Sequence, residues 1–167
     1  MSEQTTLHPV TPDLHPLVER LGQLYRHDLS EFRDSWPDEE GTYRFPRLTA
    51  YLSDDPDRQA WLIRSGEHVA GFAFVRGLTE PARHIGEFFV VRRARRRGVG
   101  HDAALQLLRR HPGPWRIAFQ DENPGAARFW RRVATDAVGD AWHEERLPVP
   151  DKPWLPPDVW LSLDTGA

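Results

Sequence analysis

The chain has 167 residues, a length that suits one domain, and we expect a single domain over residues 1–167. Hydrophobic residues make up 39% of it and charged residues 28%, which excludes a disordered chain. The net charge of −3 excludes a general attraction to nucleic acid or anionic lipid, and the absence of cysteine excludes disulfides, thiolate zinc sites and cysteine nucleophiles. No apolar run reaches the about 18 residues of a membrane span, and the start of the chain does not resemble a signal peptide. We therefore expect a cytoplasmic protein.

The first predicted element is an amphipathic helix that begins near Thr11 and Pro12. Its apolar stripe continues to Asp28, and a carboxylate on a core-facing stripe means either that the helix bends near His27 or that Asp28 has a buried partner. A second, shorter helix is expected over residues 45–52. The stripe consists of residues at three- and four-residue steps: Leu14, Leu17, Val18, Leu21, Leu24 and Tyr25.

Strands are predicted next, over residues 60–63 and 69–78, and the turn between them indicates a hairpin. The segment from Ile85 to Val91 is nearly continuous in apolar residues, which predicts a central strand. This order of elements indicates a mixed sheet with helices on both faces. The remaining predictions, in chain order, are a helix from Val99, a strand over 115–119, a helix opened by Asn123 and Pro124, and strands over 138–145 and 158–164.

Positive charge is concentrated in one turn between a predicted strand and a predicted helix. Five of the six positions from 92 to 97 are arginine. Backbone N–H groups at a helix start are unpaired, the helix dipole is positive there, and Gly98 and Gly100 allow a ligand to approach the backbone closely. These features predict a pyrophosphate site. A P-loop is excluded because no Gly-Lys-Ser/Thr is present, and the three-glycine dinucleotide fingerprint is incomplete.

Two motifs carry a resemblance to a known family. Arg95-Arg96-Arg97-Gly98-Val99-Gly100 matches the pattern Arg/Gln-x-x-Gly-x-Gly/Ala, and Asn123-Pro124-Gly125-Ala126 looks like an Asn-x-x-Ala helix start. Over Ile85 to about Val133, the chain resembles the GNAT superfamily of acyl-CoA-dependent N-acyltransferases. The resemblance implies an α/β (α+β) fold. Its sheet would be mixed and mostly antiparallel, with about seven strands flanked by about four helices and a splay between the fourth and fifth strands.

The resemblance also implies how acetyl-CoA would be held. The backbone strand edge of Phe88, Phe89 and Val90 would pair with the pantetheine amides, and a backbone N–H there would stabilise the developing oxyanion. Asn123 and Trp130 would contact the cofactor. Many relatives carry a tyrosine at the position of Trp130 to protonate the leaving thiolate, which an indole N–H does not do at ordinary pH. The pyrophosphate would be bound by the backbone amides of Arg95, Arg96, Arg97, Gly98, Val99 and Gly100.

Two residues are candidates for the catalytic general base that makes the acceptor amine neutral. Glu87 lies on the predicted central strand, where burial would raise its pKa toward a useful value. His84 titrates near neutrality unaided. Relatives often place a carboxylate on this strand, which favours Glu87; the alternative is a structural salt bridge between Glu87 and an arginine.

Tyr25, Asp28 and Glu31 are the candidate acceptor-binding residues, because the resemblance places the first helices along the acceptor site. Tyr25 and Asp28 share the apolar face of the first helix, although ordinary core packing is the alternative for Tyr25. The acidic stretch from Asp28 to Asp57 suggests a cationic small molecule, and a solvated surface is the alternative. The eight histidines show no paired ligand spacing, so no metal is expected.

We predict an enzyme, an N-acetyltransferase that moves an acetyl group from acetyl-CoA to a primary amine by direct attack in a ternary complex. An acyl-cysteine intermediate is excluded because the chain has no cysteine. A protein or peptide acetyltransferase and a non-catalytic acyl-CoA-binding regulator are the alternatives, and Trp130 keeps the second open. No nucleic acid or membrane partner is expected, and a homodimer is left open.

Overall fold

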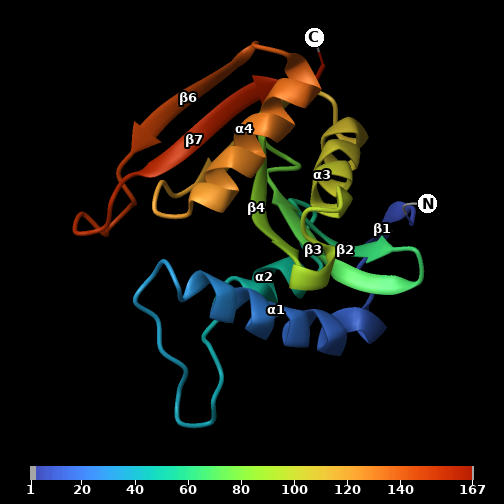
Figure 1. Ribbon diagram of the computed structural model, residues 1–167, viewed down its shortest axis with the longest axis vertical. Helices are drawn as coiled ribbons and strands as arrows, with labels where there is room; N and C mark the ends of the chain where they lie inside the picture. The colour runs from blue at the N-terminus through green and yellow to red at the C-terminus, as the bar shows by residue number, and fades with distance from the viewer. Residues whose placement is uncertain (1–2, 167) are drawn as a thin grey trace.

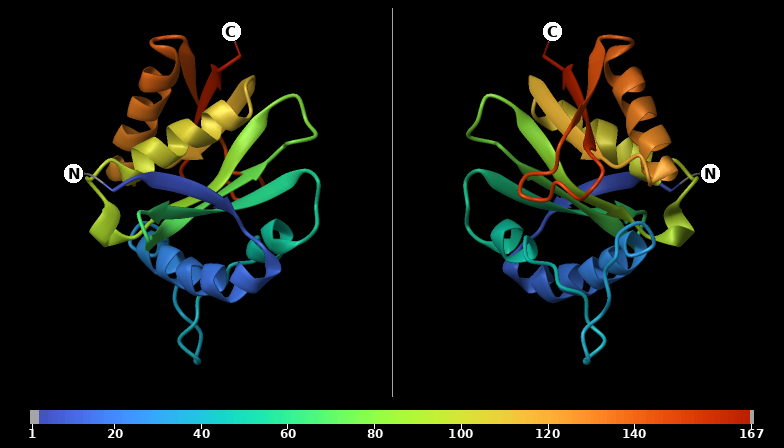
Figure 2. Two further views of the ribbon diagram at one scale, coloured as in Figure 1. Left: turned by 90° about the vertical axis from the view of Figure 1, so that its right-hand side faces the viewer. Right: turned by 90° about the vertical axis from the view of Figure 1, so that its left-hand side faces the viewer.

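A seven-stranded sheet forms the centre of the computed structural model, which describes residues 3–166 (Figure 1). Helices α1 (His15–Leu29) and α2 (Leu48–Leu52) lie on one face, and α3 (Val99–Arg110) and α4 (Pro124–Val138) lie on the other (Figure 2). The expected fold class is confirmed. In sheet order the strands are β1 (Thr5–Pro9), β2 (Arg58–Ser65), β3 (His68–Arg76), β4 (Arg83–Val90), β5 (Pro114–Phe119), β7 (Asp158–Asp164) and β6 (Trp142–Leu147).

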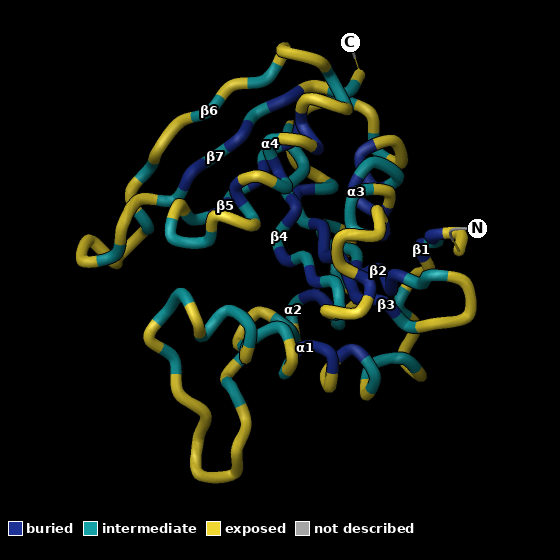
Figure 3. Tube along the Cα trace, viewed as in Figure 1, coloured by how far each residue is buried: buried dark blue, intermediate teal, exposed yellow. Residues whose placement is uncertain are grey.

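The alternation of side chains along the strands divides the hydrophobic core into two layers. Phe72, Phe74 and Phe89 pack beneath α1 and α2, whereas Trp115 and Ile117 pack beneath α3 and α4. Buried residues accordingly run along the central strands, and the segment between α1 and α2 is mostly exposed and extends away from the sheet (Figure 3). None of the described helices is both long and apolar enough to cross a membrane.

Strands β4 and β5 separate soon after they begin to pair. Within residues 3–166, this pair is parallel and every other neighbouring pair is antiparallel. The pairing stops at Ile85 and Ile117, although β4 continues beside β3 to Val90 and β5 continues beside β7 to Phe119. The two strands therefore leave a gap in the middle of the sheet, and each has a free backbone edge along it.

A β-bulge at Gly86 lies where the two strands separate. Phe74 pairs with Glu87 and Val75 with Ile85, which leaves Gly86 as the extra residue on β4. Ile85 packs in the layer under α3 and α4, whereas Glu87 points to α1. The bulge thus turns Glu87 toward α1 at the edge of the gap.

Gly86→Ala is expected to lower the free energy of unfolding by about 1–3 kcal/mol. A Cβ atom at Gly86 would lie 1.9 Å from the hydroxyl oxygen of Tyr51, and the Tyr51 ring is held by stacking on Phe74 at 4.8 Å between centroids. Urea denaturation measures the effect, and Tyr51→Phe in the same background should recover part of the loss. Gly125→Ala is the matched control, because its Cβ would meet nothing nearer than 3.7 Å. Equal midpoints for the two alanine variants would contradict this packing.

Several element boundaries differ from those expected. Strand β1 was missed, because it is only five residues long and ends in Pro9. The strand expected from 138 begins at Trp142, since α4 continues to Val138 and stops at Gly139, where φ is +67°.

Thr11 does not cap the first helix: its hydroxyl donates to the Asp13 carboxylate, and a 3-10 turn over Pro12–Leu14 precedes α1. The helix expected over 45–52 forms only over Leu48–Leu52.

Candidate active site

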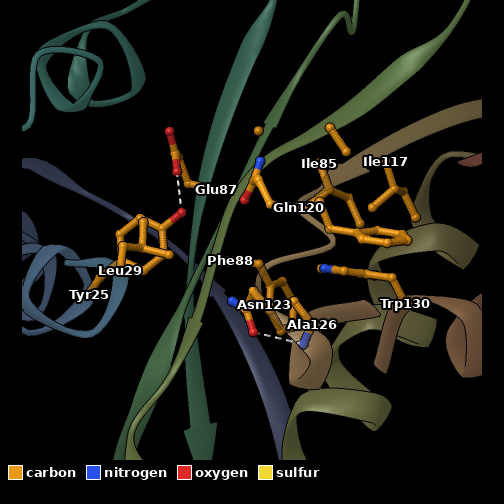
Figure 4. A pocket seen from close by; sticks show the side chains of 13 residues that line it. Tyr25, Leu29, Ile85, Glu87, Phe88, Ile117, Gln120, Asn123, Ala126 and Trp130 are labelled. Carbon is orange, nitrogen blue, oxygen red and sulfur yellow. Dashed lines mark hydrogen bonds between the residues drawn. The ribbon is translucent and has the colours of Figure 1, made fainter. Parts of the chain in front are cut away.

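The gap between β4 and β5 holds a cavity of about 100 Å³ (Figure 4). Tyr25 and Glu87 lie on one side of β4, and Phe88 and Trp130 lie on the other, as the close-up shows. Asn123, at the start of α4, is also part of the lining. The cavity therefore joins the two faces of the sheet and brings together five of the predicted site residues.

Glu87 is the charged side chain of this lining among the described residues. It is 8% exposed, its Oε2 accepts a hydrogen bond from the Tyr25 hydroxyl, and its Oε1 lies 3.7 Å from the Arg47 guanidinium. Burial raises the pKa of Glu87 above its ordinary value, although the bond from Tyr25 and the charge of Arg47 oppose this. Glu87 is thus a buried carboxylate of raised basicity at the edge of the gap.

His84 lies on β4 before the gap and is not part of the cavity lining. Its ring meets the ring of Trp160 edge-on, with 5.8 Å between the centroids. Burial, together with the positive charges of Arg76 and Arg116, lowers the pKa of His84 to about 4. His84 is therefore neutral at physiological pH and does not titrate near neutrality as the sequence suggested.

The arginine-rich turn ends at the exposed Gly98, which directly precedes α3. Arg96 and Gly98 have positive φ angles, +60° and +83°, and the first intrahelical bond runs from the Asp102 N–H to the Gly98 carbonyl. The N–H groups of Val99, Gly100 and His101 precede that bond, so the helix offers them no partner. A Cβ at Gly100 would lie 3.2 Å from the Val90 side chain, so the start of α3 lies tightly against the end of β4.

The free edge of β4 is formed by alternate residues. The Val91 N–H donates to the Ala70 carbonyl of β3, and alternation then turns the backbone groups of Phe88 and Val90 away from β3, toward the gap. Phe89 has the opposite orientation: its backbone faces β3, and its side chain is buried beneath α1. The Val90 carbonyl accepts a hydrogen bond of 2.8 Å from Arg95 Nε.

Asp28, a carboxylate on the apolar stripe of the first helix, forms ion pairs with two arginines, one of the two alternatives that the sequence predicted for it. Its carboxylate pairs with Arg95, and with Arg92 at 2.9 Å, and its side chain is 20% exposed. Partial burial acts to raise the pKa of Asp28, but these two ion pairs outweigh it and hold the pKa below its usual value. Asp28 thus ties α1 to the arginine-rich turn, and neither Asp28 nor the exposed Glu31 lines the cavity.

Much of the acidic stretch around α2 is used by local structure. Asp38 accepts bonds from the backbone of Glu40 and Thr42, and Asp57 accepts bonds from Gly77 and Thr79. Asp55 pairs with Arg58. These carboxylates stabilise local structure and do not line the cavity, where Glu87 is the one acidic side chain among the described residues.

Sequence reasoning missed three residues of the site. Gly86, inside an apolar strand, is a recognisable sign of a bulge. Arg47, beside Glu87, and Gln120, in the cavity lining, carry no such sign. Gln120 Nε2 donates to Asp158 at 2.9 Å, a contact between β7 and the segment after β5 that only the fold creates.

The profile of the Acetyltransferase (GNAT) family matches residues 21–134. The chain belongs to this family. No curated protein matches the sequence. Among solved structures, an acetyltransferase from Thermus thermophilus is 18% identical, with a TM-score of 0.68 and coverage of 98% of this chain and 99% of that one.

Two further solved GNAT-fold structures carry more specific names. A spermidine N-acetyltransferase from Vibrio cholerae, in complex with CoA and spermine, is 13% identical, with a TM-score of 0.68 and coverage of 97% and 96%. A ribosomal-protein alanine N-acetyltransferase from Escherichia coli is 10% identical, with a TM-score of 0.63 and coverage of 98% and 96%. At these identities the likeness establishes the fold and not the acceptor.

Acetyl-CoA, which GNAT acetyltransferases use, fits the residues of this site. The unpaired N–H groups at the start of α3 suit a diphosphate, and the adjoining free edge of β4 suits the amides of pantetheine. Asn123 Oδ1 accepts the Ala126 N–H at 3.1 Å, so this oxygen caps α4 beside the cavity. The Trp130 indole is buried and packs edge-on against Phe88, with 5.0 Å between the ring centroids.

Proposed function

We propose that this chain acetylates a primary amine, by direct attack of the amine on acetyl-CoA in a ternary complex. The observation that supports this most strongly is the cavity through the sheet. On one side of β4 it is lined by Phe88 and Trp130; on the other it is lined by the buried carboxylate of Glu87. Donor and acceptor would thus meet from opposite faces of the sheet.

In this proposal the donor is held by the backbone of residues 96–100, by the edge groups of Phe88 and Val90, and by contacts with Asn123 and Trp130. The Arg95 N–H, expected from the sequence to take part, already donates to the Arg92 carbonyl. Acetyl-CoA supplies the activated acetyl group. Glu87, rather than His84, is the general base: its carboxylate takes a proton from the acceptor ammonium, which leaves a neutral amine and a carboxylic acid. Attack then forms the C–N bond and breaks the C–S bond, and the second proton that the nitrogen loses on becoming an amide goes to solvent. Trp130 donates at most a hydrogen bond, so the thiolate leaves without a proton from this side chain.

The acceptor is proposed to be a cationic small molecule. Glu87 is the acidic group at the cavity, and the exposed Glu31 and Asp34 lie in the segment that follows α1. One fold neighbour is named for spermidine and another for a ribosomal protein, so the alternative of a protein or peptide amine is an outcome of the test.

An amine panel tests this proposal directly. Because the chain has no cysteine, a thiol reagent reports only the CoA that is released. We expect release with at least one class among polyamines, aminoglycosides and amino-acid derivatives, and a product heavier by one acetyl group in mass spectrometry. Turnover with peptides alone would favour the protein acetyltransferase. CoA binding without turnover of any amine would favour the non-catalytic regulator and contradict the proposal.

A further inference from the structure

Tyr25 and Glu87 are 62 residues apart in the chain, yet the fold joins their side chains by a hydrogen bond. The Tyr25 ring packs against Phe45, Phe72 and Phe89, with centroid distances of 5.7, 5.4 and 5.9 Å. Three ring contacts from different elements fix the direction of the Tyr25 hydroxyl. The hydroxyl therefore points at Glu87 because of packing, and not only because of the hydrogen bond.

The hydroxyl of Tyr25 remains a donor across the working pH range. Burial, and then the negative charge of Glu87, raise the pKa of Tyr25 well above its ordinary value of 10.0. Because the Tyr25 hydroxyl stays protonated, it continues to donate its hydrogen bond to Glu87. This bond favours the ionised carboxylate and so opposes the effect of burial on Glu87.

Other groups face Glu87 from the neighbouring elements, and they act more weakly than the bond from Tyr25. The Arg47 side chain, before α2, is 74% exposed and stays 3.7 Å away, so solvent screens it. Arg26 of α1 and Arg76 of β3 add smaller positive contributions. Tyr51 of α2 also senses the charge of Glu87, but its hydroxyl lies over Gly86. Tyr25 is thus the uncharged group placed to control Glu87.

We infer that Tyr25 is a positioning residue: its hydroxyl holds the Glu87 carboxylate at the edge of the gap and keeps it ionised when the acceptor ammonium arrives. This role rests on the proposed function, in which Glu87 is the base. A carboxylate left in the same site without this donor would hold its proton to a higher pH. Less of the enzyme would then have an active base at neutrality.

Tyr25→Phe tests this inference because it removes the hydroxyl and keeps the ring. The acid limb of the pH profile of kcat/KM is expected to move up by about one pH unit, so that activity near pH 7 falls several-fold and returns toward the wild-type value at higher pH. The affinity for CoA should not change. Tyr43→Phe is the matched control, since it removes a hydroxyl that lies 3.3 Å from His27, away from Glu87. Arg47→Gln should move the limb less than Tyr25→Phe does.

A loss of activity that is uniform across pH, or reduced CoA binding, would show a merely structural role and overturn the inference. A second readout does not depend on turnover: the carbon-13 NMR titration of the Glu87 carboxyl, assigned through its absence in Glu87→Gln. Its midpoint should be higher in Tyr25→Phe than in the wild type. An unchanged midpoint in Tyr25→Phe would refute the role of Tyr25. If the midpoint shifts in Tyr25→Phe but the wild-type protein acetylates no amine, the proposed function alone is refuted.

Discussion

Glu87→Gln is expected to lower kcat/KM at pH 7 by about 10²–10⁴-fold, the usual contribution of a positioned general base. Glutamine keeps the size of the side chain and can still accept the bond from Tyr25, but it takes no proton from the acceptor. Steady-state kinetics with acetyl-CoA and an accepted amine measure the effect. The acid limb of the wild-type pH profile should also disappear.

Glu67→Gln, in the exposed β2–β3 turn, is the matched control and should keep full activity. The affinity of Glu87→Gln for CoA should equal that of the wild type, because the substitution leaves the arginine-rich turn and the start of α3 unchanged. A general base contributes about 10²-fold or more to the rate. If the activity of Glu87→Gln stayed within about twofold of the wild type, another group or water would have to remove the proton. Glu87 would then be a structural residue paired with Arg47.

The same substitution has a pH-dependent effect on stability. Since the pKa of Glu87 is raised above 4.5, the folded protein holds this proton more tightly than the unfolded chain. Folding therefore becomes less favourable as the pH rises from 4.5 through the folded-state pKa. The free energy of unfolding of Glu87→Gln, relative to the wild type, should increase over that window in urea denaturation. A difference that does not vary with pH would contradict the raised pKa.

Arg97→Glu is expected to weaken CoA binding about 10- to 100-fold, or about 1.4–2.8 kcal/mol. Arg97 is exposed, directly precedes Gly98 at the start of α3 and, unlike Arg92 and Arg95, has no ion pair within residues 3–166. In Arg97→Glu, the glutamate carboxylate would repel a diphosphate bound at the N-terminus of α3. Because the repulsion is electrostatic, the loss should shrink as the salt concentration rises.

Arg109→Glu is the matched control, since it makes the same charge change in the last turn of the same helix. It should leave the Kd for CoA nearly unchanged. If both variants weakened binding equally, the effect would come from net charge, and the diphosphate would not lie at the start of α3.

The sequence predicted the central strand β4 and the glycine-containing turn before α3 well, because both rest on local patterns. The apolar run from Ile85, the glycines of the turn and the Asn123 cap each determine a structure within a few residues. Asp28 shows the limit of such patterns: its place on the apolar stripe correctly predicted a partner or a bend, but not that the partners are Arg92 and Arg95. That pairing depends on how α1 crosses the sheet.

The proposed acceptor side was less predictable, because its contacts join residues that are far apart in the chain. The sequence predicts both Glu87 and Tyr25 as site residues, yet nothing local shows that one donates to the other. The carboxylates of the stretch from Asp28 to Asp57 looked available for a cation, but several of them bind nearby backbone N–H groups or arginines. His84 resembled a base by its ordinary pKa, and only its burial reveals that it stays neutral.

Calorimetric titration of the purified protein with CoA tests the donor site most directly. CoA should bind at one site per chain with a Kd in the micromolar range, about −8 kcal/mol. Phosphopantetheine, which has a single phosphate in place of the diphosphate and lacks the 3′-phosphoadenosine, should bind at least tenfold more weakly. No heat with CoA, or equal affinity for both compounds, would contradict a diphosphate held by the start of α3.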